Sequence, residues 1–138
     1  MTYHEKFTLK TKGFCDVHDV TEKVKKIVEK SKIKDGVVVI GVTGSTAGVT
    51  TLEYEPGLKK DLKEAFDRLV PQDLEYAHNV KWGDGNGFSH IRSSLLGMSV
   101  SVALIDNQIK LGTWQQLVMV DFDNRDRERE VVVQVLGD

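Results

Sequence analysis

The sequence predicts an α+β fold: a two-layer α/β sandwich in which two main helices pack on one face of a mostly antiparallel sheet. Three observations support this prediction. Segments patterned as strands outnumber segments patterned as helices, most connections are of hairpin length, and runs such as residues 37–40 and 131–136 are rich in β-branched residues. The chain contains no repeat, low-complexity tract or linker, so we expect a single domain over residues 1–138.

The first half of the chain contains elements in the order strand, helix, strand, strand, helix. Residues 6–11 alternate apolar with polar side chains, which is the period of a half-buried strand. Asp19 or Thr21 can cap the helix that follows, whose apolar positions share one face. The β-branched run 37–40 predicts a strand covered on both faces. A small-residue break and a strand over residues 49–54 come next, and a second amphipathic helix ends before the following proline.

The second half is dominated by strands. Residues 98–104 and 109–120 are patterned as strands, and Asp106-Asn107 between them suits a two-residue hairpin turn because both residue types tolerate positive φ. The last strand covers residues 131–136. Because two of the predicted strands are apolar on both sides, the second face of the sheet needs cover, and a subunit interface is the simplest cover available to so short a chain.

Composition excludes several classes of protein. The chain has 138 residues, a formal net charge of −2 and one cysteine. A general nucleic-acid binder usually carries a basic excess, so we expect no nucleic-acid partner. A single cysteine permits no intrachain disulfide and no cysteine-based zinc site. The polar N-terminus lacks the apolar core of a signal peptide, and no apolar run approaches the roughly 20 residues of a membrane span, so we expect a cytoplasmic protein with no membrane partner.

Residues 76–94 gather an unusual variety of chemically active side chains. Two of the four histidines lie here together with an aspartate, two asparagines, three serines and an arginine. Three glycines in the same segment argue against an ordinary strand or helix. Imidazole, carboxylate and cation brought together can bind a metal, move a proton or hold phosphate. We therefore predict a functional site on this segment.

The histidines and carboxylates each have two interpretations. His78 and His90 have eleven residues between them, which is not a short metal-ligand spacing, so they can form a structural pair or a functional one. With one carboxylate, Asp84 or Glu53, they would leave open positions on zinc or a similar ion. Glu53 is either a solvated carboxylate at a strand end or a group that accepts a proton and orients an imidazole.

Three arginines are candidates for binding phosphate. The planar guanidinium groups of Arg92, Arg127 and Arg129 can bind a diphosphate in bidentate fashion. Charge signs alternate over residues 124–130, so a solvated edge with ion pairs is the plainer interpretation, and for Arg125 we prefer it. Arg127 and Arg129 would lie on the same side of an extended segment, which leaves phosphate binding open for both.

A set of motifs occurs in one order along almost the whole chain. They are Gly44 to Glu53, His78-Asn79, Asp84-Gly85-Asn86-Gly87, Ser89 to Gly97, Leu111 to Gln115, and Arg127-Glu128-Arg129. With them the chain resembles the YjbQ-like family of secondary thiamine-phosphate synthase enzymes, and Ser-His-Ile-Arg-Ser-Ser-Leu-Leu-Gly followed by Gly-Thr-Trp-Gln is specific in combination. The resemblance implies a sandwich that assembles as a homotrimer with its site near subunit boundaries. It also implies a weak synthase activity that joins hydroxymethylpyrimidine diphosphate to thiazole phosphate and releases pyrophosphate.

One departure from the family's pattern concerns metal binding. The family carries a histidine at the position of Gly44, where it completes a three-histidine cluster with the equivalents of His78 and His90. The resemblance thus implies that a divalent metal, zinc or magnesium, would be held here by only two imidazoles, and we expect no nucleotide or organic cofactor.

These observations lead to two hypotheses. The first is an enzyme for phosphorylated heteroaromatic compounds, with Trp82 as a candidate for stacking on the ring. Its catalytic groups would be His78, His90, Glu53 and Asp84, and its substrate or phosphate ligands would be Asn79, Asn86, Arg92, Ser93, Ser94, Arg127 and Arg129. The alternative is a non-catalytic binding protein for a small phosphorylated ligand or a metal ion.

Overall fold

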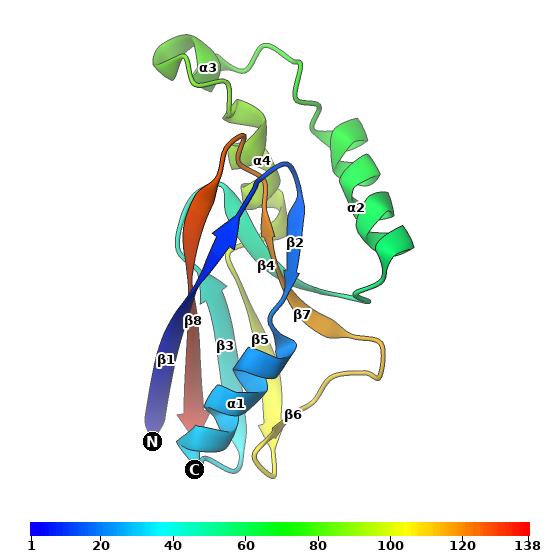
Figure 1. Cartoon of the computed structure of the whole chain (residues 1–138). Helices are drawn as coiled ribbons and strands as arrows, with labels where there is room; N and C mark the ends of the chain where they lie inside the picture. The colour runs from blue at the N-terminus through cyan, green and yellow to red at the C-terminus, as the bar shows by residue number, and fades with distance from the viewer.

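The computed structural model describes all 138 residues, and its strands form two antiparallel sheets (Figure 1). The larger sheet has the strand order β1-β8-β3-β5-β6 and the smaller one the order β2-β7-β4. The strands are β1 (Thr2–Thr11), β2 (Asp16–Asp19), β3 (Gly36–Val42), β4 (Ala47–Leu52), β5 (Ser99–Ile105), β6 (Gln108–Ile109), β7 (Gln116–Asp121) and β8 (Arg127–Gly137). Every strand pairing is antiparallel.

Four helices complete the fold: α1 (Thr21–Ser31), α2 (Pro56–Leu69), α3 (Ala77–Trp82) and α4 (Gly87–Leu96). The mixed α+β class is confirmed, but the prediction of one sheet with both main helices on a single face is wrong. Helix α1 shares the main core with the five-stranded sheet and the inner face of β4 and β7. Helix α2 contributes Phe66 to a second core on the other face of β7. The two helices therefore lie on opposite sides of the three-stranded sheet.

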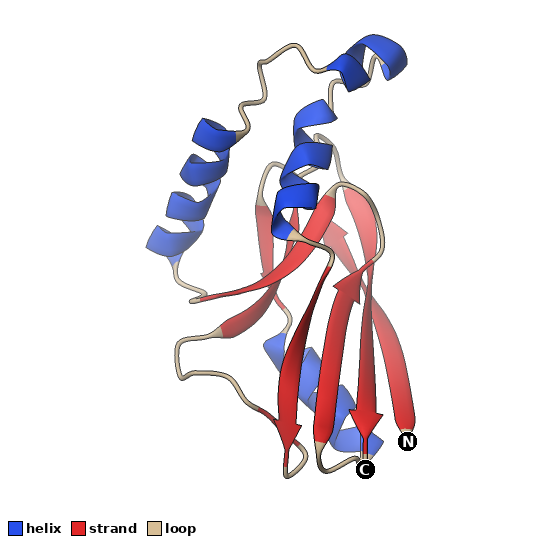
Figure 2. Ribbon diagram, turned by 180° about the vertical axis from the view of Figure 1, so that it is seen from behind, coloured by secondary structure: helices blue, strands red, loops and turns tan.

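Strand β7 explains why two cores form. Leu117 and Met119 belong to the main core, whereas Val118 and Val120 belong to the second core with Phe66. Since side chains alternate between the two faces of a strand, a run that is apolar at every position must be covered on both. The small sheet is accordingly an inner layer between the large sheet and the pair α2 and α4 (Figure 2).

The strand predicted over residues 109–120 divides between the two sheets. Asp106 and Asn107 adopt φ of 53° and 59°, so the predicted two-residue turn is confirmed. Strand β6 ends after two residues, at Ile109, and the chain then turns where Gly112 and Gln115 exchange hydrogen bonds. After this turn the chain joins the other sheet as β7.

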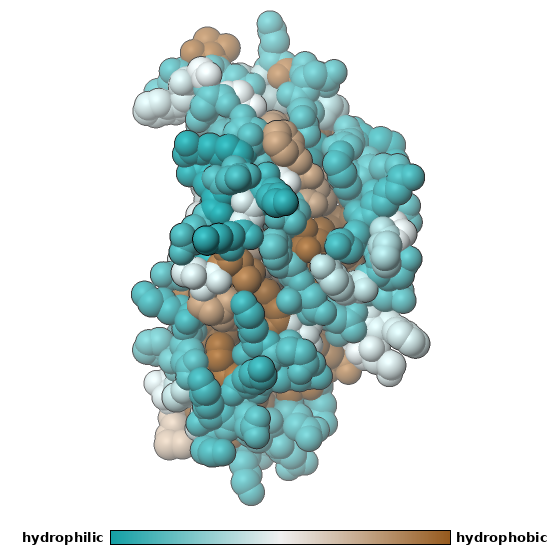
Figure 3. All heavy atoms as spheres, in the orientation of Figure 1, coloured by the Kyte–Doolittle hydropathy of each residue, from teal (hydrophilic) through white to brown (hydrophobic).

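The outer face of the five-stranded sheet is not covered by any helix (Figure 2). Val37, Val39 and Val132 are half-buried on this face, and Leu136 is exposed. Covering by a second subunit therefore stays a prediction. On the face seen in Figure 3 the surface is mostly hydrophilic, and hydrophobic atoms show in a narrow band down the middle and in a spot over α3, where Val80 is exposed. No helix combines the length and the apolar character that crossing a bilayer requires.

Candidate functional site

A pocket of about 390 Å³ lies where three distant segments of the chain meet. The loop between β3 and β4, the region from α3 to the first turns of α4, and the start of β8 come together at one end of the sheets (Figure 1). The residues that line the pocket are Gly44, Ser45, Thr46, His78, Trp82, Asp84, Asn86, His90, Arg127 and Arg129. Six predicted site residues are therefore brought together: His78, Asp84, Asn86, His90, Arg127 and Arg129.

The rings of His78 and His90 lie next to each other in the lining of the pocket. The ring centroids of His78 on α3 and His90 on α4 are 4.4 Å apart, with the planes inclined by 58°. Asp84 Oδ1 lies 3.9 Å from His78 Nε2. Burial lowers the pKa of His90, and the neighbouring His78 lowers it further. His90 is therefore mostly neutral near pH 7, with one ring nitrogen free to accept a proton or a hydrogen bond.

Two buried carboxylates hold the arginines in place behind the histidines. Arg129 donates from Nε to Oδ2 of Asp121 at 2.6 Å and from Nη2 to Oδ1 at 3.1 Å. The same Nη2 also donates to Oγ1 of Thr46. Arg127 donates from Nε to Oδ2 of Asp123 at 2.8 Å. Both carboxylates are fully buried, so the pairs are rigid and each negative charge is compensated by an arginine.

Asn86 connects this network to the pocket. Its side-chain Nδ2 donates to Oδ1 of Asp123 at 3.3 Å, while its Oδ1 has no hydrogen-bond partner although the residue is only 5% exposed. Burial alone would raise the pKa of Asp123, but hydrogen bonds from the Asn124 amide, Asn86, Thr46 and Arg127 outweigh burial and lower it. Asp123 is accordingly a carboxylate at neutral pH, and this favours the orientation of Asn86 that points its amino group at Asp123.

Gly44 lines the pocket next to Arg129. Gly44 has φ of +128°, a conformation that side chains rarely adopt, and a Cβ there would lie 2.5 Å from Nη1 of Arg129. The space of the missing side chain is therefore bordered by a guanidinium group. No group of three or more histidine, cysteine, aspartate or glutamate side chains could hold a metal ion. The residues present thus do not fit a metal ion ligated by three side chains.

Arg92 was predicted to bind phosphate, and this prediction is wrong. The side chain is fully buried in α4, with Nε and Nη2 donating to the carbonyl of Val70 at 3.1 and 2.8 Å and Nη2 donating to Oδ1 of Asp67 at 3.1 Å. Val70 is the C-terminal cap of α2. A cation is favourable at the C-terminal end of a helix, so Arg92 joins α4 to the end of α2 and does not face the pocket.

Ser93, Ser94 and Asn79 also hold the structure together outside the pocket. Ser93 donates to the carbonyl of Ala47 at 2.5 Å, which ties α4 to β4. Ser94 donates to the carbonyl of His90, one turn earlier in the same helix. Asn79 accepts the amide of Gly87 at 2.8 Å, at the first position of α4. None of the three lines the pocket, so substrate binding by these residues stays a prediction.

Glu53 lies far from the histidines of its own chain. It follows the last residue of β4, whereas the pocket lies at the first residues of that strand. Six strand residues at about 3.3 Å each separate the two ends by roughly 20 Å. Glu53 is also exposed. Of its two interpretations, the structure supports the solvated carboxylate at a strand end.

The buried acids Asp121 and Asp123 are the site residues that sequence reasoning missed. They continue the alternation of Leu117 and Met119, which face the main core, so their carboxylates point inward. Two acids on the inward face of a buried strand need cationic or hydrogen-bonding partners. That requirement was the available signal, and the alternating arginines of β8 satisfy it.

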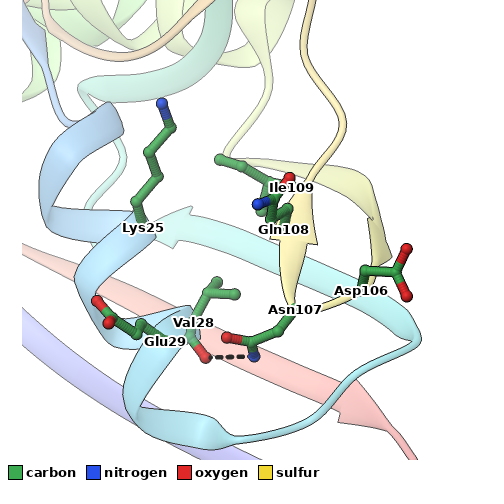
Figure 4. A pocket seen from close by; sticks show the side chains of 7 residues that line it. All are labelled: Lys25, Val28, Glu29, Asp106, Asn107, Gln108 and Ile109. Atoms are coloured by element: carbon green, nitrogen blue, oxygen red, sulfur yellow. Dashed lines mark hydrogen bonds between the residues drawn. The ribbon is translucent and has the colours of Figure 1, made fainter.

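A larger cavity of about 490 Å³ lies elsewhere, between α1 and the β5–β6 turn (Figure 4). Its lining includes Lys25 and Glu29 of α1 together with Asp106 and Asn107. The Asn107 amide donates to the carbonyls of Val28 and Ile33, so this side chain fastens the turn to the end of α1. No histidine or arginine lines this cavity, whereas the 390 Å³ pocket is lined by two of each.

Comparisons with known proteins agree with one another. The chain matches the family described as UPF0047 protein YjbQ-like over residues 5–138. A UPF0047 protein of Methanocaldococcus jannaschii is 35% identical over 134 residues, which cover 96% of this chain and 94% of that protein. The UPF0047 protein YugU of Bacillus subtilis is 30% identical over 130 residues, with 94% and 96% covered.

A crystal structure from Sulfolobus solfataricus, described as a YbjQ-like protein of unknown function, superimposes with a TM-score of 0.95. It is 30% identical in sequence, and the superposition covers 100% of this chain and 99% of that one. Sequence and fold thus agree over essentially the full length, and the chain belongs to the YjbQ-like UPF0047 family.

Proposed function

We propose that the protein is a small-molecule enzyme that binds a phosphorylated heteroaromatic compound and handles a diphosphate leaving group, as its resemblance to thiamine-phosphate synthases implies. The observation that carries the proposal is the meeting of an imidazole pair and two fixed arginines in one pocket. Arginine forks bind phosphate oxygens, and neutral imidazoles donate and accept hydrogen bonds. Trp82, 65% exposed at the same pocket, offers a flat surface to a heteroaromatic ring.

The proposed reaction needs little covalent chemistry from the protein. A ring nitrogen of the thiazole phosphate forms a bond to the methylene carbon of the pyrimidine, and the bond from that carbon to the diphosphate oxygen breaks with its electron pair. Negative charge then grows on the departing pyrophosphate. Arg127 and Arg129 are held in position before the reaction begins, so they stabilise this charge without reorganising. An imidazole N–H of His78 or His90 can donate to the same oxygens.

The test is pyrophosphate release from hydroxymethylpyrimidine diphosphate and thiazole phosphate in the presence of magnesium. We expect turnover by the wild type and its loss in His78→Ala and His90→Ala, with cooperative thermal unfolding retained. His4→Ala is the matched control, because His4 is exposed on β1 and lies outside the pocket. Absence of turnover in the wild type, or full turnover in both pocket variants, would refute the proposal.

A second candidate function is a binding protein that captures a small phosphorylated ligand without transforming it. It is favoured by Gly44, since the pocket offers two imidazoles and no third. Gly44→His is not a simple restoration of an imidazole, because the new side chain would displace Arg129. Tight binding of both substrates without any release of pyrophosphate would select this function.

We also propose a homotrimer, in which neighbouring subunits cover the open face of the five-stranded sheet. The half-buried valines on that face support this assembly. Sedimentation equilibrium should give the mass of three 15.5 kDa chains. A monomeric mass at micromolar concentration would contradict it.

A further inference from the structure

We propose that Gly44 is a specificity-determining residue: by lacking a side chain, it leaves Nη1 of Arg129 open to the pocket, where this nitrogen anchors a phosphate or diphosphate group without a metal ion held by the protein. The inference rests on the proposed function, from which it takes both the choice of this pocket as the binding site and the phosphorylated ligand. It adds the residue that selects an oxyanion over a metal ion and the atom that binds the oxyanion.

The orientation of Arg129 follows from its partners. Asp121 accepts hydrogen bonds from Nε and Nη2, which form one edge of the guanidinium plane. Thr46 accepts a further hydrogen bond from Nη2. The remaining nitrogen, Nη1, lies at the opposite edge of the planar group and has no hydrogen-bond partner in the chain. Arg129 is only 7% exposed and lines the pocket, so a nearly buried donor is left uncommitted at this site.

Gly44 keeps that donor accessible. A Cβ at this position would lie 2.5 Å from Nη1, closer than any non-bonded carbon and nitrogen atoms can approach. Arg129 cannot withdraw without breaking its pair with Asp121, whose carboxylate is completely buried. Any side chain at position 44 would therefore cover Nη1 or push the guanidinium aside. Glycine alone satisfies both the φ of +128° and the open path to the arginine.

The surrounding groups favour phosphate over a carboxylate or a metal ion. Arg127 comes from the same strand, its side chain is one-third exposed, and it is bound to Asp123 through Nε and no other nitrogen. Donors thus reach the pocket from β8 and, through the imidazoles, from α3 and α4. Groups approaching from several directions suit a ligand with three or more acceptor oxygens. A metal ion would instead find two imidazoles and Asp84, which do not form a three-ligand group, beside two guanidinium groups whose charge repels it.

The experiment is calorimetric titration of the purified protein with inorganic pyrophosphate in the presence of EDTA. We expect the wild type to bind, and Gly44→Ala to bind about tenfold more weakly or worse, which corresponds to the loss of one charge-assisted hydrogen bond. Gly97→Ala is the matched control. Its φ of +95° imposes comparable backbone strain, but nothing lies within 4 Å of its added Cβ, and it does not line the pocket. We expect its affinity to equal that of the wild type.

A second variant keeps the test decisive if Gly44→Ala fails to unfold cooperatively. Arg129→Lys retains the charge beside Asp121 but has no Nη1, so it should lose pyrophosphate affinity to a similar extent. Three results would overturn the inference: no binding by the wild type in EDTA, binding that appears only when zinc is added, or equal affinities for wild type and Gly44→Ala.

Failure of this inference is distinguishable from failure of the proposed function. Pyrophosphate binding that depends on Gly44 but is not accompanied by turnover would support this inference and refute the enzymatic function. Turnover that is lost in His90→Ala but unchanged in Gly44→Ala would support the enzyme and refute the role of Gly44.

Discussion

Replacing Arg92 with methionine tests whether this arginine holds the fold together or binds a ligand. Methionine preserves much of the side-chain volume against the Phe88 ring, which lies 5.0 Å from the guanidinium carbon. It removes both donors to the Val70 carbonyl and the pair with Asp67. The substitution therefore separates the polar role of Arg92 from its packing.

The magnitude follows from what each lost partner can recover. A buried carbonyl left without a donor costs about 1–3 kcal/mol. Asp67 is 39% exposed and keeps its ion pair with Lys63 at 2.8 Å. Loss of the Arg92–Asp67 pair therefore adds under about 1 kcal/mol. We expect the free energy of unfolding to fall by about 2–3 kcal/mol and Tm to fall by roughly 6–10 °C for a chain of this size. Urea titration followed by circular dichroism measures the free energy of unfolding.

Arg68→Met is the matched control, because Arg68 is exposed on α2 and should change the unfolding free energy by no more than about 0.5 kcal/mol. Folded Arg92→Met should bind pyrophosphate as the wild type does, since Arg92 does not line the pocket. Unchanged stability, or lost pyrophosphate binding in a protein of wild-type stability, would refute the structural role.

Three further predictions concern the pocket and its supports. Because the pKa of His90 is lowered in the folded protein, the unfolded chain binds more protons than the folded one as pH falls below about 6.5, and stability decreases toward acid. His90→Asn should flatten this pH dependence in thermal melts between about pH 5 and pH 8. Asp121→Asn removes the carboxylate that Arg129 contacts through two nitrogens and leaves only Asp123, 3.7 Å from Nη2, so urea titration should show a loss of about 3 kcal/mol, the lower end for breaking a buried ion pair. Ser93→Ala leaves the Ala47 carbonyl without its side-chain donor, and the same titration should show a loss of about 1–2 kcal/mol. A flat pH profile in the wild type, or wild-type stability in either of the other variants, would contradict the corresponding prediction.

Local patterns were sufficient where a feature depends on neighbouring residues. Period-two alternation predicted β1, the β-branched run predicted β3, and the Asp106-Asn107 pair predicted the turn after β5. The same reasoning could not detect that the apolar run ending at Val120 divides between two sheets. The two halves pair with different strands, β6 with β5 and β7 with β2 and β4, and this pairing is set only in the folded chain.

The histidines, Asp84 and the arginines of β8 were predicted from their chemical types to share a site, and the structure places them around one pocket. Which polar groups face the pocket was a different question. Arg92 and Arg129 are both nearly buried arginines, and in both Nη1 has no hydrogen-bond partner, yet Arg92 joins two helices and only Arg129 lines the pocket. The difference arises from partners: Arg92 binds the Val70 carbonyl, 22 residues earlier, whereas Arg129 binds Asp121 on β7, a strand of the other sheet.

The sequence by itself determined the α+β class, the family and the candidate imidazoles, because these depend on local periodicity and on residue types that recur in a set order. The tertiary structure alone decided the two-sheet arrangement, the structural role of Arg92, the distance between Glu53 and the pocket of its own chain, and the contact between position 44 and Arg129. Each of those outcomes depends on which distant groups share a buried volume, and burial is a property of the folded chain as a whole.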